Sequence, residues 1–252
     1  MPIEKTILLA GYGWFAGIPE GETNNAELIA RALDGETLVI TRDDGETVCG
    51  HIHSIVVPVV WETAFPQVKA AIEATRPDLV LAIGTDARAS ALRPESYAVN
   101  WQRGTDALPE DPSRQTTVDG KILPEGEDFL RGTLPYEAMV HEILAAGIPA
   151  QLGALLPPRE DVPLCAAATP GMYLCNKMAY LLADYGQRHG LPAGFLHVPT
   201  QPQYAARRRL AQLEGLSGEA LAEAMAKPLA AMPLPMMIEG TRAALRACLL
   251  EL

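Results

Sequence analysis

The sequence predicts an α/β fold: a single domain over residues 1–252, with three layers (α/β/α) around a twisted, mostly parallel central sheet. Short, continuously apolar runs, such as residues 6–11 and 78–84, are typical of strands buried on both faces of a parallel sheet. Segments with helical periodicity alternate with these runs, which indicates βαβ units whose ligand crevice lies at the carboxyl ends of the strands. A chain of 252 residues is long enough for one such core.

The first strand, residues 6–11, opens into a glycine-rich loop with three aromatic residues. Asn24 is a suitable N-cap for a helix over residues 25–33, which has apolar residues on one face. Glycines 11, 13 and 17 do not have the GxGxxG spacing of a dinucleotide-binding turn. The loop therefore gives no support for a dinucleotide cofactor.

Residues 37–41 and 48–60 are predicted strands, joined by an acidic turn. His51 and His53 lie two apart and so share one face of a strand. That spacing would suit a metal ion, but no third ligand is evident, and a solvated strand face is the favoured interpretation. A helix with Val68, Ala71 and Ile72 inward follows, and then the buried strand 78–84.

Three stretches are predicted to be surface inserts, near residues 101–133, 151–166 and 207–231. The first is polar and rich in Asp, Gly and Pro, which indicates a long surface excursion. The third contains a helical pattern over 218–226 and an arginine run, which is typical of a solvated helix face. Helices are also predicted over 133–146 and 238–250.

Composition excludes several classes of function. The net charge of −11 leaves no basic patch for a nucleic-acid partner. No apolar run reaches the roughly 18 residues of a membrane span, and no signal peptide precedes the first strand, so no membrane partner is expected. The four cysteines have no paired spacing of a zinc or redox type, so reduced thiols in the cytoplasm, without a metal, are expected.

Two segments carry the best candidates for chemistry. Residues 169–176 form a loop that runs into Cys175, directly before a helical pattern over 177–188. Unpaired N–H groups and the helix dipole at such a position favour a thiolate over a thiol. Residues 194–199 read as a short buried strand with His197 near its end. Taken alone, a buried structural cysteine and an ordinary histidine are the more common interpretation of two such residues.

Three segments resemble the pyroglutamyl peptidase I family of cysteine peptidases, the pyrrolidone-carboxylate peptidases. GMYLCN at 171–176 is similar to its cysteine signature, GFLHVP at 194–199 to its histidine signature, and PESYAVN at 94–100 to the stretch with its glutamate. They occur in the family's order. The resemblance implies that Cys175, His197 and Glu95 form the catalytic triad. From the residues alone, the alternative is that Glu95 is an exposed charge at the start of a strand.

The resemblance also implies a substrate site. On the family pattern, Tyr12 and Phe15 are the two aromatic residues that hold the flat lactam ring of the substrate; the alternative is that both simply pack under the loop. The chain departs from the pattern at residues 85–94, where glycines are missing and Arg88 comes one place early, and at Pro170, where the family usually has alanine.

The activity implied is removal of N-terminal pyroglutamyl residues from peptides through an acyl-enzyme, without a metal or organic cofactor. The family's assembly as tetramers implies a homo-oligomer, unless the inserts block that packing. Two alternatives stay open: an amide or lactam hydrolase that uses the same triad on another acyl group, and a catalytically impaired homologue that serves in binding or assembly.

Overall fold

A six-stranded sheet forms the centre of the computed structural model, which describes residues 1–15, 18, 21–106, 115–156 and 168–252. Its four inner strands are parallel, and the two outer strands are antiparallel to their neighbours. In spatial order the strands are β2 (Thr37–Thr41), β3 (Thr47–Val57), β1 (Ile3–Tyr12), β4 (Leu79–Thr85), β10 (Ala193–Val198) and β5 (Arg93–Pro94). The prediction of a mostly parallel central sheet is confirmed.

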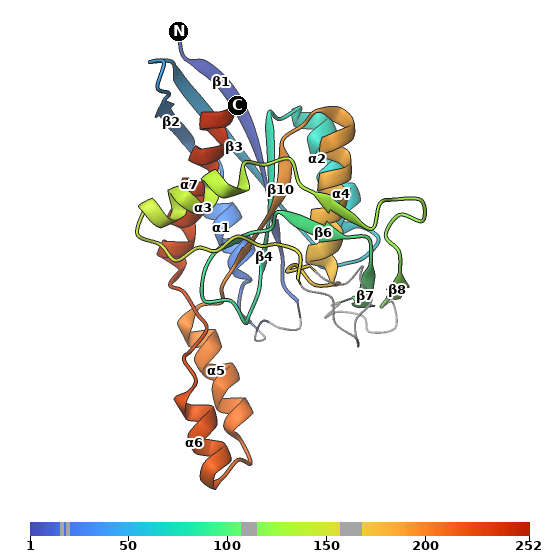
Figure 1. Cartoon of the computed structure of the whole chain (residues 1–252), viewed down its shortest axis with the longest axis vertical. Coiled ribbons are helices and arrows are strands. Elements are labelled where there is room, and N and C mark those ends of the chain that lie inside the picture. Colours follow the sequence, from blue (N-terminus) through green and yellow to red (C-terminus); the bar gives the residue numbers. More distant parts are fainter. Residues whose placement is uncertain (16–17, 19–20, 107–114, 157–167) are drawn as a thin grey trace.

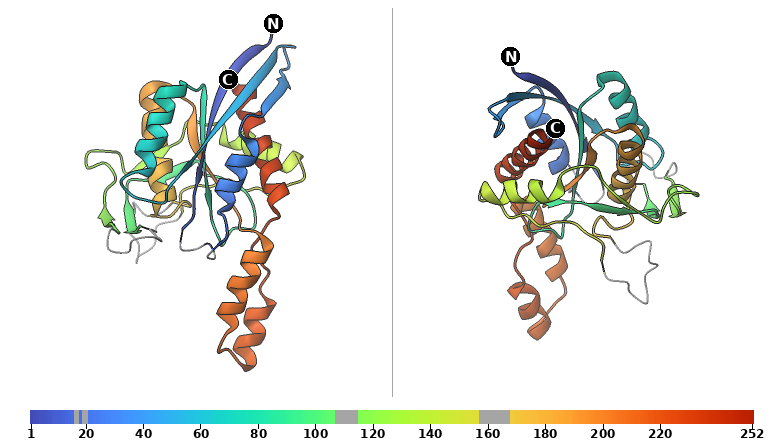
Figure 2. Two further views of the ribbon diagram at one scale, coloured as in Figure 1. Left: turned by 180° about the vertical axis from the view of Figure 1, so that it is seen from behind. Right: turned by 45° about the horizontal axis from the view of Figure 1, so that its top comes forward.

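Helices cover both faces of the sheet, as Figures 1 and 2 show. One face carries α1 (Asn25–Leu33), α3 (Tyr136–Ala145) and α7 (Leu234–Glu251), and the other carries α2 (Ala64–Thr75) and α4 (Leu174–His189). The predicted α/β/α layering is therefore confirmed.

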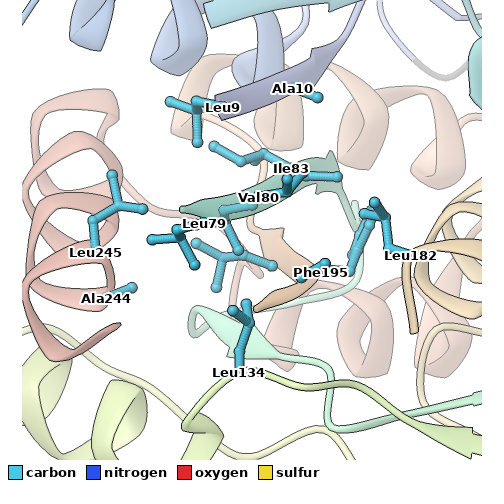
Figure 3. Close-up of a cluster of buried hydrophobic side chains, with 14 of the residues drawn as sticks. Leu9, Ala10, Leu79, Val80, Ile83, Leu134, Leu182, Phe195, Ala244 and Leu245 are labelled. Carbon is cyan, nitrogen blue, oxygen red and sulfur yellow. The ribbon is translucent and has the colours of Figure 1, made fainter. Parts of the chain in front are cut away.

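The core lies on both sides of β4, all seven residues of which are buried. Figure 3 shows Leu79 with Leu245 of α7 on one side, and Phe195 of β10 with Leu182 of α4 on the other. Each of these side chains is fully buried. Because burying one such side chain stabilises the fold by about 1.5–3 kcal/mol, these layers hold the carboxyl ends of the strands in fixed positions.

The first helix begins where the sequence predicts. The side chain of Asn24 accepts a hydrogen bond from the Ala26 N–H at 3.2 Å and so caps α1. A Cβ at Gly11 would overlap the backbone of Ala26, so only glycine lets α1 pack this closely against β1. The predicted strand 48–60 instead ends at Val57, because Pro58 has no N–H to donate to a neighbouring strand.

The predicted surface excursion at 101–133 contains three strands that the sequence analysis missed. Two of them, β7 (Gln102–Thr105) and β8 (Thr117–Gly120), form a hairpin, and β9 (Phe129–Arg131) pairs with β6 (Tyr97–Val99). Their polar composition hid them, because β7 and β8 have no fully buried residue. Residues 107–114 lie outside the described part of the chain.

The segment 207–231 is mostly helical, as predicted for part of it. Helices α5 (Pro202–Leu213) and α6 (Gly218–Ala226) form a pair that projects from the body of the molecule, orange in Figure 1. No residue of α6 is buried. Most of the predicted insert at 151–166 falls on residues 157–167, which lie outside the described residues.

Candidate active site

Cys175 is the second residue of α4. The preceding turn includes Gly171, whose φ of 78° is in the left-handed region that favours glycine. Tyr173 is the N-cap and makes no side-chain capping hydrogen bond. The first N–H groups of a helix have no partner within the helix, and the Tyr173 side chain does not cap those beside the Cys175 thiol.

His197 is held on β10 directly beside this thiol. Its backbone lies opposite Gly84 of β4. A Cβ at Gly84 would come within 2.9 Å of Cys175 Sγ, so the glycine makes room for the thiol between α4 and the sheet. The Cys175 thiol is close enough to the His197 side chain to raise its pKa, and the His197 ring packs edge-on against Phe195 with centroids 5.0 Å apart.

Glu95 is the third residue of the group and lies beside Nδ1 of the imidazole. Its Oε1 lies 2.6 Å from His197 Nδ1, and its Oε2 accepts a hydrogen bond from the Thr169 hydroxyl. The carboxylate is fully buried, so the interpretation of Glu95 as an exposed charge is wrong. The structure thus brings together Cys175, His197 and Glu95, which are up to 102 positions apart in the chain.

The electrostatics favour a charged imidazole. Burial works to lower the pKa of His197, but the charge and hydrogen bond of Cys175, and then those of Glu95, outweigh it and raise the pKa to about 10. Burial works to raise the pKa of Glu95, but the hydrogen bond and charge of His197 and the charge of Arg93 hold it below its ordinary value. Because Glu95 is ionised, Nδ1 of His197 is the hydrogen-bond donor in the pair.

Two further residues of this network escaped the sequence analysis. Arg93 donates from Nε to Glu95 Oε1 at 2.6 Å and from a terminal nitrogen to Asp86 Oδ2 at 2.8 Å. Arg88, the arginine that the sequence analysis singled out, instead has an 89% exposed side chain. The one signal that could have found Arg93 is its spacing of two from Glu95, which puts both side chains on one side of an extended chain.

A small cavity of about 60 Å³ lies beside the thiol. Tyr12 and Phe15 both line it, together with Cys175. Tyr12 is buried, and its hydroxyl donates to the Leu174 carbonyl at 2.9 Å. The remaining lining residues are Asn24, Val59, Thr85, Tyr173 and Leu174. The two aromatic residues are therefore next to the candidate nucleophile.

The chain matches the family model described as "Pyroglutamyl peptidase" over residues 5–248. It belongs to the pyroglutamyl peptidase family. A pyrrolidone-carboxylate peptidase of Saccharolobus islandicus is 28% identical over 237 residues, which cover 94% of this chain and 91% of that protein. One of Lactobacillus helveticus is 30% identical over 206 residues, covering 81% of this chain and 88% of that protein. The family resemblance in the sequence is confirmed.

Solved structures of this family share the fold. The pyrrolidone carboxyl peptidase of Pyrococcus furiosus superposes with a TM-score of 0.72 at 24% identity, covering 98% of this chain and 99% of that one. The pyroglutamyl peptidase I of Bacillus amyloliquefaciens gives a TM-score of 0.70 at 22% identity, covering 98% and 96%.

Two other kinds of site are absent from the described residues. These residues contain no group of three or more His, Cys, Asp or Glu side chains that could hold a metal ion. His51 instead lies 2.6 Å from a carboxylate oxygen of Glu4 and 3.0 Å from the Thr37 hydroxyl. Within the same described part of the chain, no helix has the length and apolar character needed to cross a membrane.

Proposed function

We propose that this protein is a cysteine peptidase that removes N-terminal pyroglutamyl residues from peptides. The observation that supports this most is the line of Cys175, His197 and Glu95, in which Cys175 also lines an aromatic cavity. Nucleophile, base and orienting group follow one another at hydrogen-bonding range, which is the arrangement of a thiol acyl-transfer site. Family membership and the names of the relatives supply the substrate class.

In the first half of the reaction, the Cys175 thiolate attacks the carbonyl carbon that joins pyroglutamate to the next residue. The carbonyl π electrons move to oxygen, giving a tetrahedral oxyanion. When the oxyanion collapses, the C–N bond breaks, and His197 donates its proton to the departing amine, which is otherwise a poor leaving group. The product is a pyroglutamyl thioester on Cys175 and a peptide shortened by one residue.

The start of α4 is suited to binding the oxyanion. Its first N–H groups have no capping side chain, and a donor placed on a developing oxyanion is worth about 3–4 kcal/mol in well-studied enzymes. In the second half, neutral His197 takes a proton from water, whose oxygen attacks the thioester. Free pyroglutamate leaves, and the thiolate–imidazolium pair is restored.

Selectivity in this proposal comes from the cavity, where Tyr12 and Phe15 hold the flat lactam ring. The substrates are small peptides, and the triad needs no cofactor. We further propose a cytoplasmic location, because a nucleophilic thiol persists in a reducing compartment. Assembly into a homo-oligomer is part of the proposal by analogy with the family's tetramers.

A second candidate is an amide or lactam hydrolase with the same triad and another acyl specificity. It is favoured by the loop after β4, where Asp86 and Arg93 form an ion pair in a stretch that departs from the family's glycine-rich pattern. The third possibility, a homologue that binds without turnover, requires an unreactive Cys175 and is decided by the same experiment.

The test is release of a fluorescent amine from a pyroglutamyl amide by the parent protein, Cys175→Ala and Cys49→Ala. Cys49 is the matched control, because it is a partly buried free cysteine near the start of β3, at the opposite end of the sheet. We expect release by the parent and Cys49→Ala, and none by Cys175→Ala. An inactive parent whose Cys175 is rapidly alkylated by iodoacetamide would support the second candidate. Slow alkylation would contradict both enzyme proposals and leave the binding homologue.

A further inference from the structure

Arg93 is placed against the triad by strand register. It lies directly opposite His197 in the antiparallel pair of β5 and β10, and facing residues in such a pair project from the same side. The chain stays extended beyond β5, since the Glu95 N–H donates to the Phe195 carbonyl at 2.9 Å. Arg93 and Glu95 therefore share a side as well. One guanidinium nitrogen lies only 3.4 Å from His197 Nδ1.

Asp86 forms an ion pair with a terminal nitrogen of the Arg93 guanidinium, whereas Glu95 accepts from its Nε. Its carboxylate accepts from Arg93 at 2.8 Å, and the two side chains are only 11% and 10% exposed. The Asp86 N–H donates to the Val198 carbonyl at 2.9 Å, which anchors the loop to the end of β10. The buried charges thus alternate in sign from Asp86 through Arg93, Glu95 and His197.

We propose that Arg93 and Asp86 are a positioning pair: Arg93 holds Glu95 against His197 as a carboxylate, and Asp86 offsets the repulsion between Arg93 and the imidazolium. The pair acts through Glu95 and does not contact the reacting atoms. This inference rests on the proposed function, in which His197 transfers the proton. It adds which two residues control how tightly the imidazole binds that proton.

The two members have opposite effects on the imidazole proton. Arg93 carries a positive charge beside Nδ1, which disfavours the imidazolium, while it also fixes the oxygen that accepts from Nδ1. Asp86 carries a negative charge within the same buried network, which favours the imidazolium. Burial of Asp86 works to raise its pKa, but the hydrogen bond from Arg93 and further nearby hydrogen bonds and positive charges lower it to about 2, so Asp86 stays ionised in any working range.

The other titratable groups that face the network do not change their charge where His197 titrates. Tyr12 of β1 faces Cys175, and Tyr136 of α3 lies near Glu95. Burial, followed by nearby negative charges, raises the pKa of both phenols, so they stay neutral where His197 titrates. Without Arg93, Glu95 still has its hydrogen bonds from His197 and Thr169. Arg88 lies 3.4 Å from Asp86 Oδ1, but its side chain is 89% exposed and its charge is screened by water. The signs expected for variants at positions 86 and 93 therefore follow from the charges of Asp86 and Arg93.

The test follows the His197 imidazole by ¹H–¹⁵N NMR against pH, with Cys175→Ala in every sample so that the thiolate does not mask the effect. Arg93→Gln should raise the pKa of the imidazole by about one unit, the usual scale for a charge at this range. Asp86→Asn should lower it. Arg93→Lys, which keeps the charge, should stay nearer to the parent than Arg93→Gln does, and the double variant Arg93→Gln/Asp86→Asn should return towards the parent.

A purely structural role for the pair predicts a different result. Loss of packing would move the titration in the same direction for both single variants, or leave it unmoved, and either outcome would overturn the proposal. If Arg93→Gln fails to fold, the near-isosteric Asp86→Asn decides: a downward shift supports the proposal, and an unchanged or higher pKa overturns it. The measurement needs no turnover, so its outcome is independent of whether pyroglutamyl peptides are the substrates.

Discussion

The carboxyl ends of the central strands and the helical pair α5–α6 are built on opposite principles. At the strand ends, charged side chains are buried and bonded on every side: Glu95 is sealed from solvent and accepts hydrogen bonds from His197, Arg93 and Thr169. In the helical pair, no residue of α6 is buried, and Leu210 and Met225 are 67% and 63% exposed.

The difference supports the proposed site at the strand ends. Burying charged groups costs free energy unless ion pairs and hydrogen bonds offset it. Buried charged networks are therefore frequent at sites of chemistry. The helical pair has no such network, and it meets the body mainly through its base. There Tyr204 donates to Glu22, and Arg208 donates to the Ala87 carbonyl, beside the loop that carries Asp86.

The largest expected effect comes from displacing Glu95. A Cβ at Gly153 would overlap Glu95 Oε2 and come within 2.8 Å of Thr169 Oγ1, so Gly153→Ala must push the carboxylate from the imidazole. We expect kcat/KM for a pyroglutamyl amide to fall about 100-fold or more, the usual cost of misplacing a catalytic group by an ångström. Gly120→Ala in β8 is the control, since a Cβ there meets nothing within 4 Å. Equal activity of both variants would contradict the role given to Glu95.

Two leucines compare the stabilities of the two regions. Leu182 of α4 is fully buried in the core, and Leu210 of α5 is 67% exposed. Leu182→Ala should lower the free energy of unfolding by about 2–5 kcal/mol. Leu210→Ala should change it by no more than about 0.5 kcal/mol. Urea denaturation of both variants measures this, and a large loss for Leu210→Ala would show that the helical pair is part of the cooperative core.

The pH profile of activity tests the charge on His197. The imidazolium must donate a proton to the leaving amine, and the pKa of His197 is raised to about 10, so kcat/KM should hold on the alkaline side until the pH rises through that value. Glu95→Gln removes a carboxylate that raises this pKa. The alkaline fall should therefore move to lower pH by about one unit or more. An unshifted profile would mean that Glu95 does not support the imidazolium.

The smallest expected effect is at the surface of the helical pair. Arg207 forms an ion pair with Glu22 at 2.9 Å, with side chains 59% and 30% exposed. Arg207→Ala should lower the free energy of unfolding by less than about 1 kcal/mol, because solvent and salt screen such pairs. Its kcat/KM should match that of the parent. Substantial loss of activity would mean that the helical pair shapes the site after all.

Much of the fold followed from local patterns in the sequence. The apolar runs predicted β1 and β4 because parallel strands are buried on both faces, and Asn24 predicted the start of α1 because it satisfies a helix N–H. The strands β7, β8 and β9 escaped, because short and partly exposed pairs leave no such run.

The site was predictable only in part. The positions of Cys175, His197 and Glu95 came from family resemblance, and no local pattern predicts that residues so far apart in the chain meet. Arg93 was missed because β5 is only two residues long and its partner β10 lies some hundred residues later. Gly153 was missed because its importance is a lack of volume beside Glu95, which exists only in three dimensions.

The most direct test of the account is the intact mass of the protein quenched in acid during turnover of a pyroglutamyl amide. The mechanism predicts a covalent adduct of one pyroglutamyl group, located on Cys175 by peptide mapping and absent from Cys175→Ala. Hydrolysis without such an adduct, an adduct on another residue, or no hydrolysis at all would contradict acyl transfer through Cys175.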